Sequence, residues 1–316
     1  MFTFEGDFRL HFWVLNRRMG ARMKKIFLLM SLIGALTLSA NAANGESGDT
    51  PLRGEGRSFK GHIGLQLYSL RDSFGKDVEG SLDKVKAFGF KYVELASTYG
   101  KSNEEMKKLL SDRGLVMVAG HFGFDELKND PESVGKRAQE LGLRYVGTAW
   151  IPHTTPFDAA QATAAAEVFN NAGKVLANYG VKLYYHNHGY EFYPWMNGKK
   201  IMDLLMEKTD PNYVTFQMDV MWTLFPGEDP AAWLAKYPNR WELLHLKDLK
   251  LGVEGNMSGG TDTKNDVVLG TGQVNYTKVL KAAQEAGVLY YFIEDESPTV
   301  EEQLPLSLDF LERVRF

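Results

Sequence analysis

Side chains that can bind a metal ion close several apolar runs in the second half of the chain. The four residues are His186, Asp219, His245 and Glu294. Each run has the length and composition of a buried strand, and a helical pattern separates one run from the next. In an α/β barrel, the carboxyl ends of the parallel strands converge on the face that carries out the chemistry. We therefore expect these side chains to meet at one site of an enzyme.

The types of ligand narrow the chemistry of this site. The chain contains no cysteine, which excludes thiolate metal sites and cysteine nucleophiles. Carboxylate and imidazole groups suit one divalent ion of Mn, Mg, Co or Zn, and the sequence does not choose among them. A carboxylate such as Asp219 at the end of an apolar run is costly to bury unless it is paired or bound to a cation. The same residue could instead cap the helix that follows.

Further candidate residues follow other apolar runs. Glu94 and His121 could line a substrate pocket, or each could pair with a neighbour. Lys247 could contact a substrate oxygen, or form a salt bridge with the adjacent acid. His188 shares one strand face with His186 and is expected to contact substrate. Trp222 suits stacking on a sugar ring, although it could equally shield the rim of the barrel.

These residues need a scaffold, and the chain from residue 61 onward predicts one. Eight apolar runs alternate with helical patterns, and near-continuous hydrophobicity is typical of parallel strands covered on both faces. Glycine separates five helical patterns from the next run, as expected where a helix ends in a left-handed residue. No Gly-x-Gly-x-x-Gly follows the first run, so a dinucleotide-binding sheet lacks support. The pattern predicts an α/β fold, a single-domain (β/α)8 TIM barrel. The expected strands are Ile63–Tyr68, Tyr92–Ala96, Val116–Gly120, Tyr145–Ala149, Lys182–His186, Val214–Asp219, Leu243–Lys247 and Leu289–Glu294.

The first 60 residues lie outside this pattern. Residues 23–42 combine a basic start, an apolar run and an Ala-Asn-Ala ending, which is typical of a secretory signal peptide. The run is shorter than the ~20 residues of a membrane span. Residues 1–22 are interpreted as a non-native or extended lead, and residues 43–60 as a disordered linker. We expect an exported protein, periplasmic in a Gram-negative bacterium, with no membrane association after cleavage behind Ala42.

The net charge of the chain indicates which kinds of partner it can bind. The chain carries a net charge of −4, and residues 1–42 hold six basic and two acidic side chains, so the mature chain would carry −8. Nucleic-acid binding needs a basic surface, and none is expected here. A small-molecule partner is expected. A homo-oligomer is compatible with the sequence, which does not fix the oligomeric state.

Several stretches carry a resemblance to a known family. They are Ile63–Ser69, His186–Phe192, Met218–Val220, His245–Asp248, Leu269–Gly272 and Ile293–Glu294. In these stretches, residues 61–316 resemble the xylose-isomerase-like TIM barrel superfamily. Its members include sugar phosphate isomerases and epimerases, inosose isomerases and dehydratases, and AP endonucleases of family 2. The resemblance implies one divalent metal ion with ligands from strands five to eight, three of them being Asp219, His245 and Glu294.

The first ligand departs from the family pattern. Family members commonly carry a glutamate within strand five, where this chain has His186, and the nearest carboxylate is Glu191. We expect Glu191 to be the ligand or the catalytic base, with His186 as the alternative.

The resemblance and the residues together predict proton transfer next to a sugar carbonyl. A divalent ion would stabilise an enediolate, while Glu191 and Glu294 remove and return the proton. The leading expectation is a metal-dependent sugar isomerase or epimerase. The alternatives are a lyase or dehydratase of keto-sugars or 3-keto-glycosides, and a non-catalytic carbohydrate-binding barrel. A DNA endonuclease is the least favoured alternative, because the negative net charge expected for the mature chain opposes binding to DNA.

Overall fold

The structure, a computed structural model, describes residues 53–316. The predicted lead and signal peptide lie outside the described residues, as does the first part of the predicted linker. The last part of that linker, residues 53–60, packs on the domain. Phe59 is fully buried against Tyr291, with ring centroids 4.9 Å apart, and Arg53 lies 2.8 Å from a carboxylate oxygen of Glu312. The folded domain therefore begins before residue 61.

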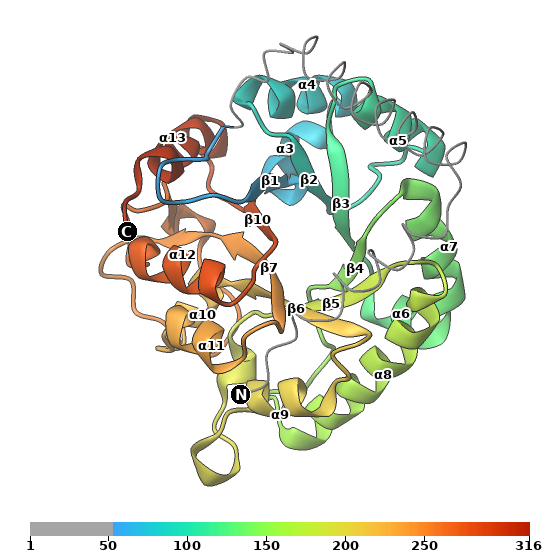
Figure 1. Ribbon diagram of the computed structural model, residues 1–316, viewed down its shortest axis with the longest axis vertical. Coiled ribbons are helices and arrows are strands. Elements are labelled where there is room, and N and C mark those ends of the chain that lie inside the picture. Colours follow the sequence, from blue (N-terminus) through green and yellow to red (C-terminus); the bar gives the residue numbers. More distant parts are fainter. Residues whose placement is uncertain (1–52) are drawn as a thin grey trace, which may run out of the picture. The chain divides into compact units, whose positions relative to one another are not determined.

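Eight parallel strands close into a barrel, seen end-on in Figure 1, and the predicted fold is confirmed. The last strand pairs with the first, so that Tyr291 lies opposite Ile63. Each expected strand is present to within about two residues at either end. The barrel strands are β1 (His62–Gln66), β2 (Tyr92–Leu95), β3 (Val116–His121), β4 (Tyr145–Thr148), β5 (Lys182–His186), β6 (Val214–Asp219), β7 (Trp241–Leu246) and β10 (Tyr290–Ile293).

Helices surround the barrel on its outer face (Figure 1). Several of them begin at an aspartate whose carboxylate accepts a backbone N–H, as Asp158 and Asp229 do. The five glycines predicted at helix ends all have positive φ, between 70° and 96°. The helices are α3 (Arg71–Phe74), α4 (Val78–Phe88), α5 (Asn103–Ser111), α6 (Phe124–Asn129), α7 (Pro131–Leu141), α8 (Ala159–Ala177), α9 (Ile201–Lys208), α10 (Val220–Leu224), α11 (Pro230–Lys236), α12 (Tyr276–Glu285) and α13 (Val300–Arg313). Short 3-10 turns are η1 (Leu67–Leu70), η2 (Tyr190–Phe192), η3 (Met196–Gly198) and η4 (Thr263–Asn265).

The core of the described residues forms three clusters. The largest fills the space between strands and helices, and a smaller one, which includes Tyr145, Tyr184 and Phe292, fills the barrel interior. The third consists of Met221, Trp222, Phe225 and Leu249. Tyr184 lies so close to β4 that a Cβ on Gly147 would come within 2.1 Å of its ring. Glycine at position 147 therefore lets the Tyr184 ring cross the barrel and place its hydroxyl in the site described below.

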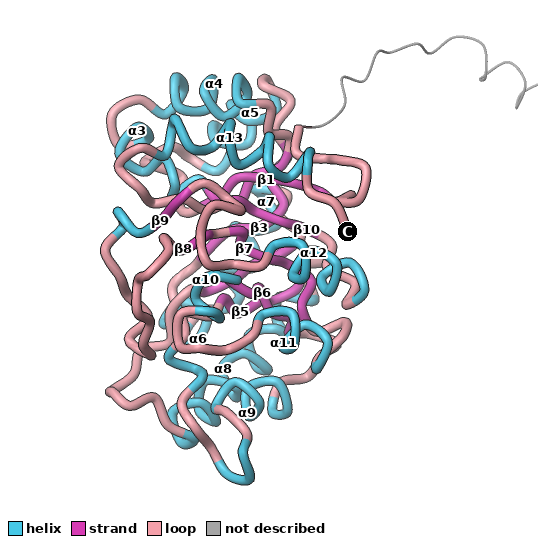
Figure 2. The backbone as a smooth tube through the Cα atoms, turned by 90° about the vertical axis from the view of Figure 1, so that its left-hand side faces the viewer, coloured by secondary structure: helices cyan, strands magenta, loops and turns pink. Residues whose placement is uncertain are grey.

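The long loop after β7 folds back over the carboxyl ends of the strands. It contains the antiparallel pair β8 (Asp248–Leu249) and β9 (Asp266–Val267), which lies at one end of the barrel in Figure 2. Within residues 53–316, no helix is both long enough and apolar enough to span a membrane.

Candidate active site

The structure brings three of the predicted ligands together at the carboxyl ends of the strands. Asp219 pairs in register with His245 on β6 and β7, and Glu294 directly follows β10. One ligand atom from each of the three residues lies within 4.8 Å of the others. All three side chains are at least nine-tenths buried. This group has the composition and closeness of a divalent metal site.

The carboxylate of Asp219 has one oxygen engaged and one free. Oδ1 accepts a hydrogen bond from the N–H of Trp222 at 2.9 Å and so caps α10. Oδ2 is buried, and no residue of the described part of the chain gives it a hydrogen bond. Burial raises the pKa of Asp219 to about 7, against the charge of Lys247. A buried carboxylate oxygen without a partner is costly, and a cation is the ligand that would satisfy it.

His245 lies between two carboxylates. Its Nε2 is hydrogen-bonded to Glu94, and its Nδ1 lies 3.3 Å from Oε2 of Glu294. Burial alone would lower the pKa of His245, but the charges of Glu94 and Glu294 outweigh it and raise the pKa to about 10. Histidines that bind metals usually donate their other ring N–H to a carboxylate. Glu94 therefore has the position of the residue that orients this ligand.

Glu94 is the centre of a buried network and does not line the cavity, contrary to one of its expected roles. Its carboxylate accepts hydrogen bonds from the hydroxyl of Tyr184 and, at 3.0 and 3.2 Å, from the amide of Gln217. Burial would raise the pKa of Glu94, but the charges of His245 and His121 outweigh it and hold the pKa well below its usual value. The carboxylate is therefore ionised and fixes the orientation of its partners.

One consequence of this network is the tautomer of His186. Gln217 donates through its amide nitrogen to Glu94, so its Oε1 must accept from Nδ1 of His186, 2.9 Å away. The proton of His186 is thus on Nδ1, and Nε2 is unprotonated. Burial, with the charge of His245, holds the pKa of His186 well below its ordinary value. His186 lines the cavity and offers a neutral nitrogen that can accept a proton.

Lys247 forms ion pairs with acids of the site. Its ammonium group is buried, lies 3.4 Å from Glu294 and 3.5 Å from Asp266, and is hydrogen-bonded to Glu296. Burial would lower the pKa of Lys247, but these carboxylates outweigh it and raise the pKa well above its usual value. The expected alternative, a salt bridge to Asp248, does not form. The ammonium group therefore neutralises acids of the site, among them the candidate metal ligand Glu294.

The structure does not bring Glu191 into this group. Both of its carboxylate oxygens accept hydrogen bonds within the turn after β5, from the backbone N–H groups of His188 and Gly189 at 2.7–3.2 Å and from the hydroxyl of Tyr185. Burial raises the pKa of Glu191 to about 7. Glu191 holds the loop that carries His188, and His186 takes the strand-five position at the site.

A cavity of about 520 Å³ adjoins the cluster, and Glu294 is the cluster residue that lines it. Three residues expected to bind substrate line it: His121, His188 and Trp222. Burial lowers the pKa of His188 to about 3, so its ring is neutral there. Part of the loop after β7 forms one wall through Gly259–Thr261 and Thr263.

Several site residues carry no role in the sequence-based prediction. Gln217 is two residues before Asp219, so strand alternation alone would have placed both on the inner face. Tyr68 follows strand one and lines the cavity, as Glu296 does beside Glu294. Asn187 accepts the N–H of Asp219 at 3.0 Å. Its position between two candidate histidines was the available signal.

Replacement of Glu94 by glutamine is expected to weaken metal affinity and activity by about 10–100-fold. The amide cannot supply the negative charge that orients His245, although it retains nearly the same volume. Metal titration of the purified protein measures the affinity. Glu140→Gln, an exposed glutamate on α7, is the matched control and should change neither value. An unchanged affinity in Glu94→Gln would contradict the orienting role.

Comparisons with known proteins define the class of this barrel. The family model for the xylose isomerase-like TIM barrel matches residues 82–314, so the chain belongs to that family. The inosose dehydratase of Geobacillus thermodenitrificans is 24% identical over 266 residues, which cover 75% of this chain and 88% of that protein. A sugar phosphate isomerase/epimerase from Parabacteroides distasonis has a crystal structure with a TM-score of 0.66, 26% identity, and coverage of 81% of this chain and 99% of that one. The IOLI protein, crystallised with a bound zinc atom, shares the fold at a TM-score of 0.63 and 13% identity, covering 78% of this chain and 95% of that one.

Proposed function

We propose that this protein is a metal-dependent sugar isomerase or epimerase that transfers a proton on a carbon next to a carbonyl. The observation that carries the proposal is one buried group, Asp219, His245 and Glu294, next to the unprotonated nitrogen of His186. Membership of a family with sugar isomerases and epimerases supports it. The signal-peptide pattern at residues 23–42 supports the further proposal of export and of an unphosphorylated sugar.

The residues of the chain divide the work between binding and proton transfer. Asp219, His245 and Glu294 would hold a divalent ion, which supplies Lewis-acid polarisation of a carbonyl oxygen when bound. His186 accepts the proton of the neighbouring carbon at Nε2, while Gln217 holds the other ring nitrogen in its protonated form. Return of that proton to the adjacent carbon gives the isomer. Epimerisation needs a second proton-transfer group on the other side of the sugar, and Glu296 lines the same cavity.

A dehydratase or lyase is the second candidate. Several relatives are named inosose dehydratase, among them one 36% identical over 196 residues. When the β carbon carries a hydroxyl or an alkoxy group, removal of the proton next to the carbonyl leads to loss of that group as water or as an alcohol. The same residues would then carry out the first step, and only the fate of the substrate would differ.

Incubation of the metal-analysed protein with free aldoses, ketoses, an inosose and 3-keto-glycosides in D₂O tests the proposal. NMR is expected to show solvent deuterium on the carbon next to the carbonyl of at least one compound. Formation of an isomer or epimer supports the leading proposal, whereas release of water or an aglycone selects the second candidate. Failure of deuterium to enter any of the compounds would contradict the leading proposal, and failure of any compound to release water or an aglycone as well would contradict both.

A further inference from the structure

A second cavity, of about 670 Å³, adjoins the candidate active site. Four residues line both cavities: Ala96, His121, Ala149 and Trp150. They follow or end β2, β3 and β4, so the two spaces meet at the carboxyl ends of these strands. The volume of the second cavity falls within the about 300–1,000 Å³ of small-molecule sites.

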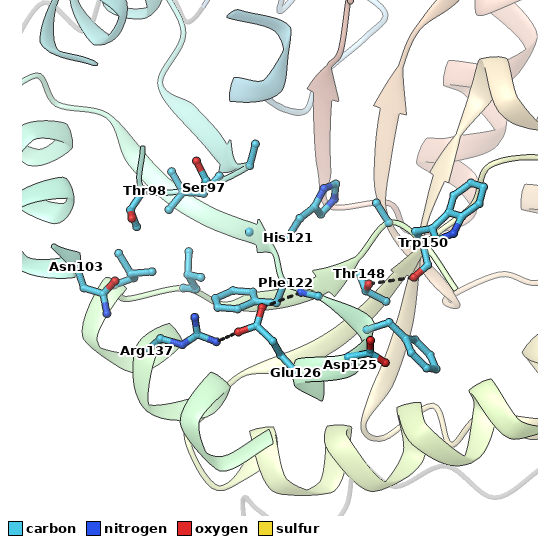
Figure 3. A pocket seen from close by; sticks show the side chains of 18 of the residues that line it. Ser97, Thr98, Asn103, His121, Phe122, Asp125, Glu126, Arg137, Thr148 and Trp150 are labelled. Atoms are coloured by element: carbon cyan, nitrogen blue, oxygen red, sulfur yellow. Dashed lines mark hydrogen bonds and ion pairs between the residues drawn. The ribbon is translucent and has the colours of Figure 1, made fainter. Parts of the chain in front are cut away.

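Two of the four residues that separate the two cavities have small side chains. Ala96 and Ala149 have the smallest side chains that carry a Cβ, and both are partly exposed. The ring of His121 points to the barrel side in Figure 3, whereas the next residue, Phe122, points into the second cavity. Trp150, 46% exposed, borders both spaces and packs beside His188 with ring centroids 5.6 Å apart. One molecule could therefore extend across His121 into both spaces.

The second cavity is mainly apolar. Its lining includes the apolar side chains Leu95, Phe122, Phe124, Leu141 and Leu143, with Ser97, Thr98 and Asn103 also present. A mainly apolar lining with a few polar groups is typical of sites for small molecules.

The charges in this cavity are largely balanced. Arg137 forms an ion pair with Glu126, drawn as a dashed line in Figure 3, and its guanidinium group lies 5.0 Å from the ring centre of Phe122. The remaining lining acid, Asp125, is exposed. A cavity whose one arginine is already paired is a poor phosphate site, and it suits an uncharged ring.

We propose that the second cavity is a subsite for an apolar ring attached to the sugar, so that the substrate is a glycoside with an aryl aglycone. The inference rests on the proposed function for the placement of the sugar in the first cavity. An aglycone at the anomeric carbon converts the carbonyl there into an acetal. The carbonyl needed for proton transfer must then be a ketone at another ring position, which an oxidation of a ring hydroxyl has to supply.

Matched probes test the subsite: methyl and phenyl 3-keto-β-D-glucopyranoside, with glucose 6-phosphate as a charged comparison. Calorimetry on the full protein is expected to show the phenyl glycoside binding about 10-fold tighter or more than the methyl glycoside, because the ring is buried. Thr98→Trp, which fills the cavity, and Phe122→Ala, which removes an apolar contact, should bring the two affinities close together. Neither residue lines the first cavity, so the affinity for the methyl glycoside should stay within about twofold. Thr98→Val is the matched control and should keep the preference.

Equal affinities in the wild type, a preference that survives Thr98→Trp, or no binding of either glycoside would overturn the subsite. Tighter binding of glucose 6-phosphate than of the phenyl glycoside would overturn it in favour of an anion site. The proposed function fails separately, when deuterium enters neither these glycosides nor any free sugar. The affinities then still decide whether the second cavity holds an apolar ring.

Discussion

Asp219→Asn is expected to lose the bound divalent ion and to lower kcat by about a thousandfold or more. The substitution exchanges the free oxygen Oδ2 for an amide nitrogen, which cannot ligate a cation, and it removes the negative charge. Loss of Lewis-acid stabilisation worth several kcal/mol corresponds to this fall in rate. Metal analysis and the deuterium-exchange assay measure the two effects.

Asparagine is chosen because it separates the two roles of Asp219. Its Oδ1 can still accept the N–H of Trp222, and asparagine is as good a helix cap as aspartate. The fold should therefore persist, with an unchanged thermal transition once the wild type has also been freed of metal. Asp112→Asn makes the same change at an exposed aspartate on the surface. A metal content equal to that of the wild type would show that the cluster does not bind the ion through Asp219.

The barrel could be predicted from the sequence because each element carries a local signal. The strands are largely buried on both faces and mostly apolar, and glycines with positive φ mark the helix ends. The meeting of Asp219, His245 and Glu294 follows from the same pattern. Parallel strands in a closed barrel bring their carboxyl ends to one face whatever the loops do.

Glu191 shows where sequence spacing fails. A carboxylate five residues after His186 could fold back to the site or turn away, and the spacing is the same in both cases. The turn after β5 places the N–H groups of His188 and Gly189 next to the carboxylate, so it is satisfied locally. Loop geometry of this kind has no periodic signal.

The pairing of Glu94 with His245 needed the structure for a different reason. The two residues are 151 positions apart, and the network between them passes through side chains on β2, β5, β6 and β7 that meet only inside the closed barrel. The second cavity also could not be predicted from the sequence, because residues far apart in the chain, at strand ends and on the surrounding helices, line it together. No pattern of residues along the chain predicts a cavity of this kind.

His186→Asn is expected to lower the rate of deuterium exchange by about 10²–10⁴-fold while the protein keeps its metal. The amide of asparagine can still donate to Oε1 of Gln217, as Nδ1 of the imidazole does at 2.9 Å. It lacks a nitrogen that accepts a proton, so the base is lost and the hydrogen-bond network is retained. His62→Asn, at an exposed histidine at the start of β1, is the matched control and should exchange deuterium at the wild-type rate. Loss of the metal in His186→Asn would identify His186 as the strand-five ligand instead, and full activity would exclude it from proton transfer altogether.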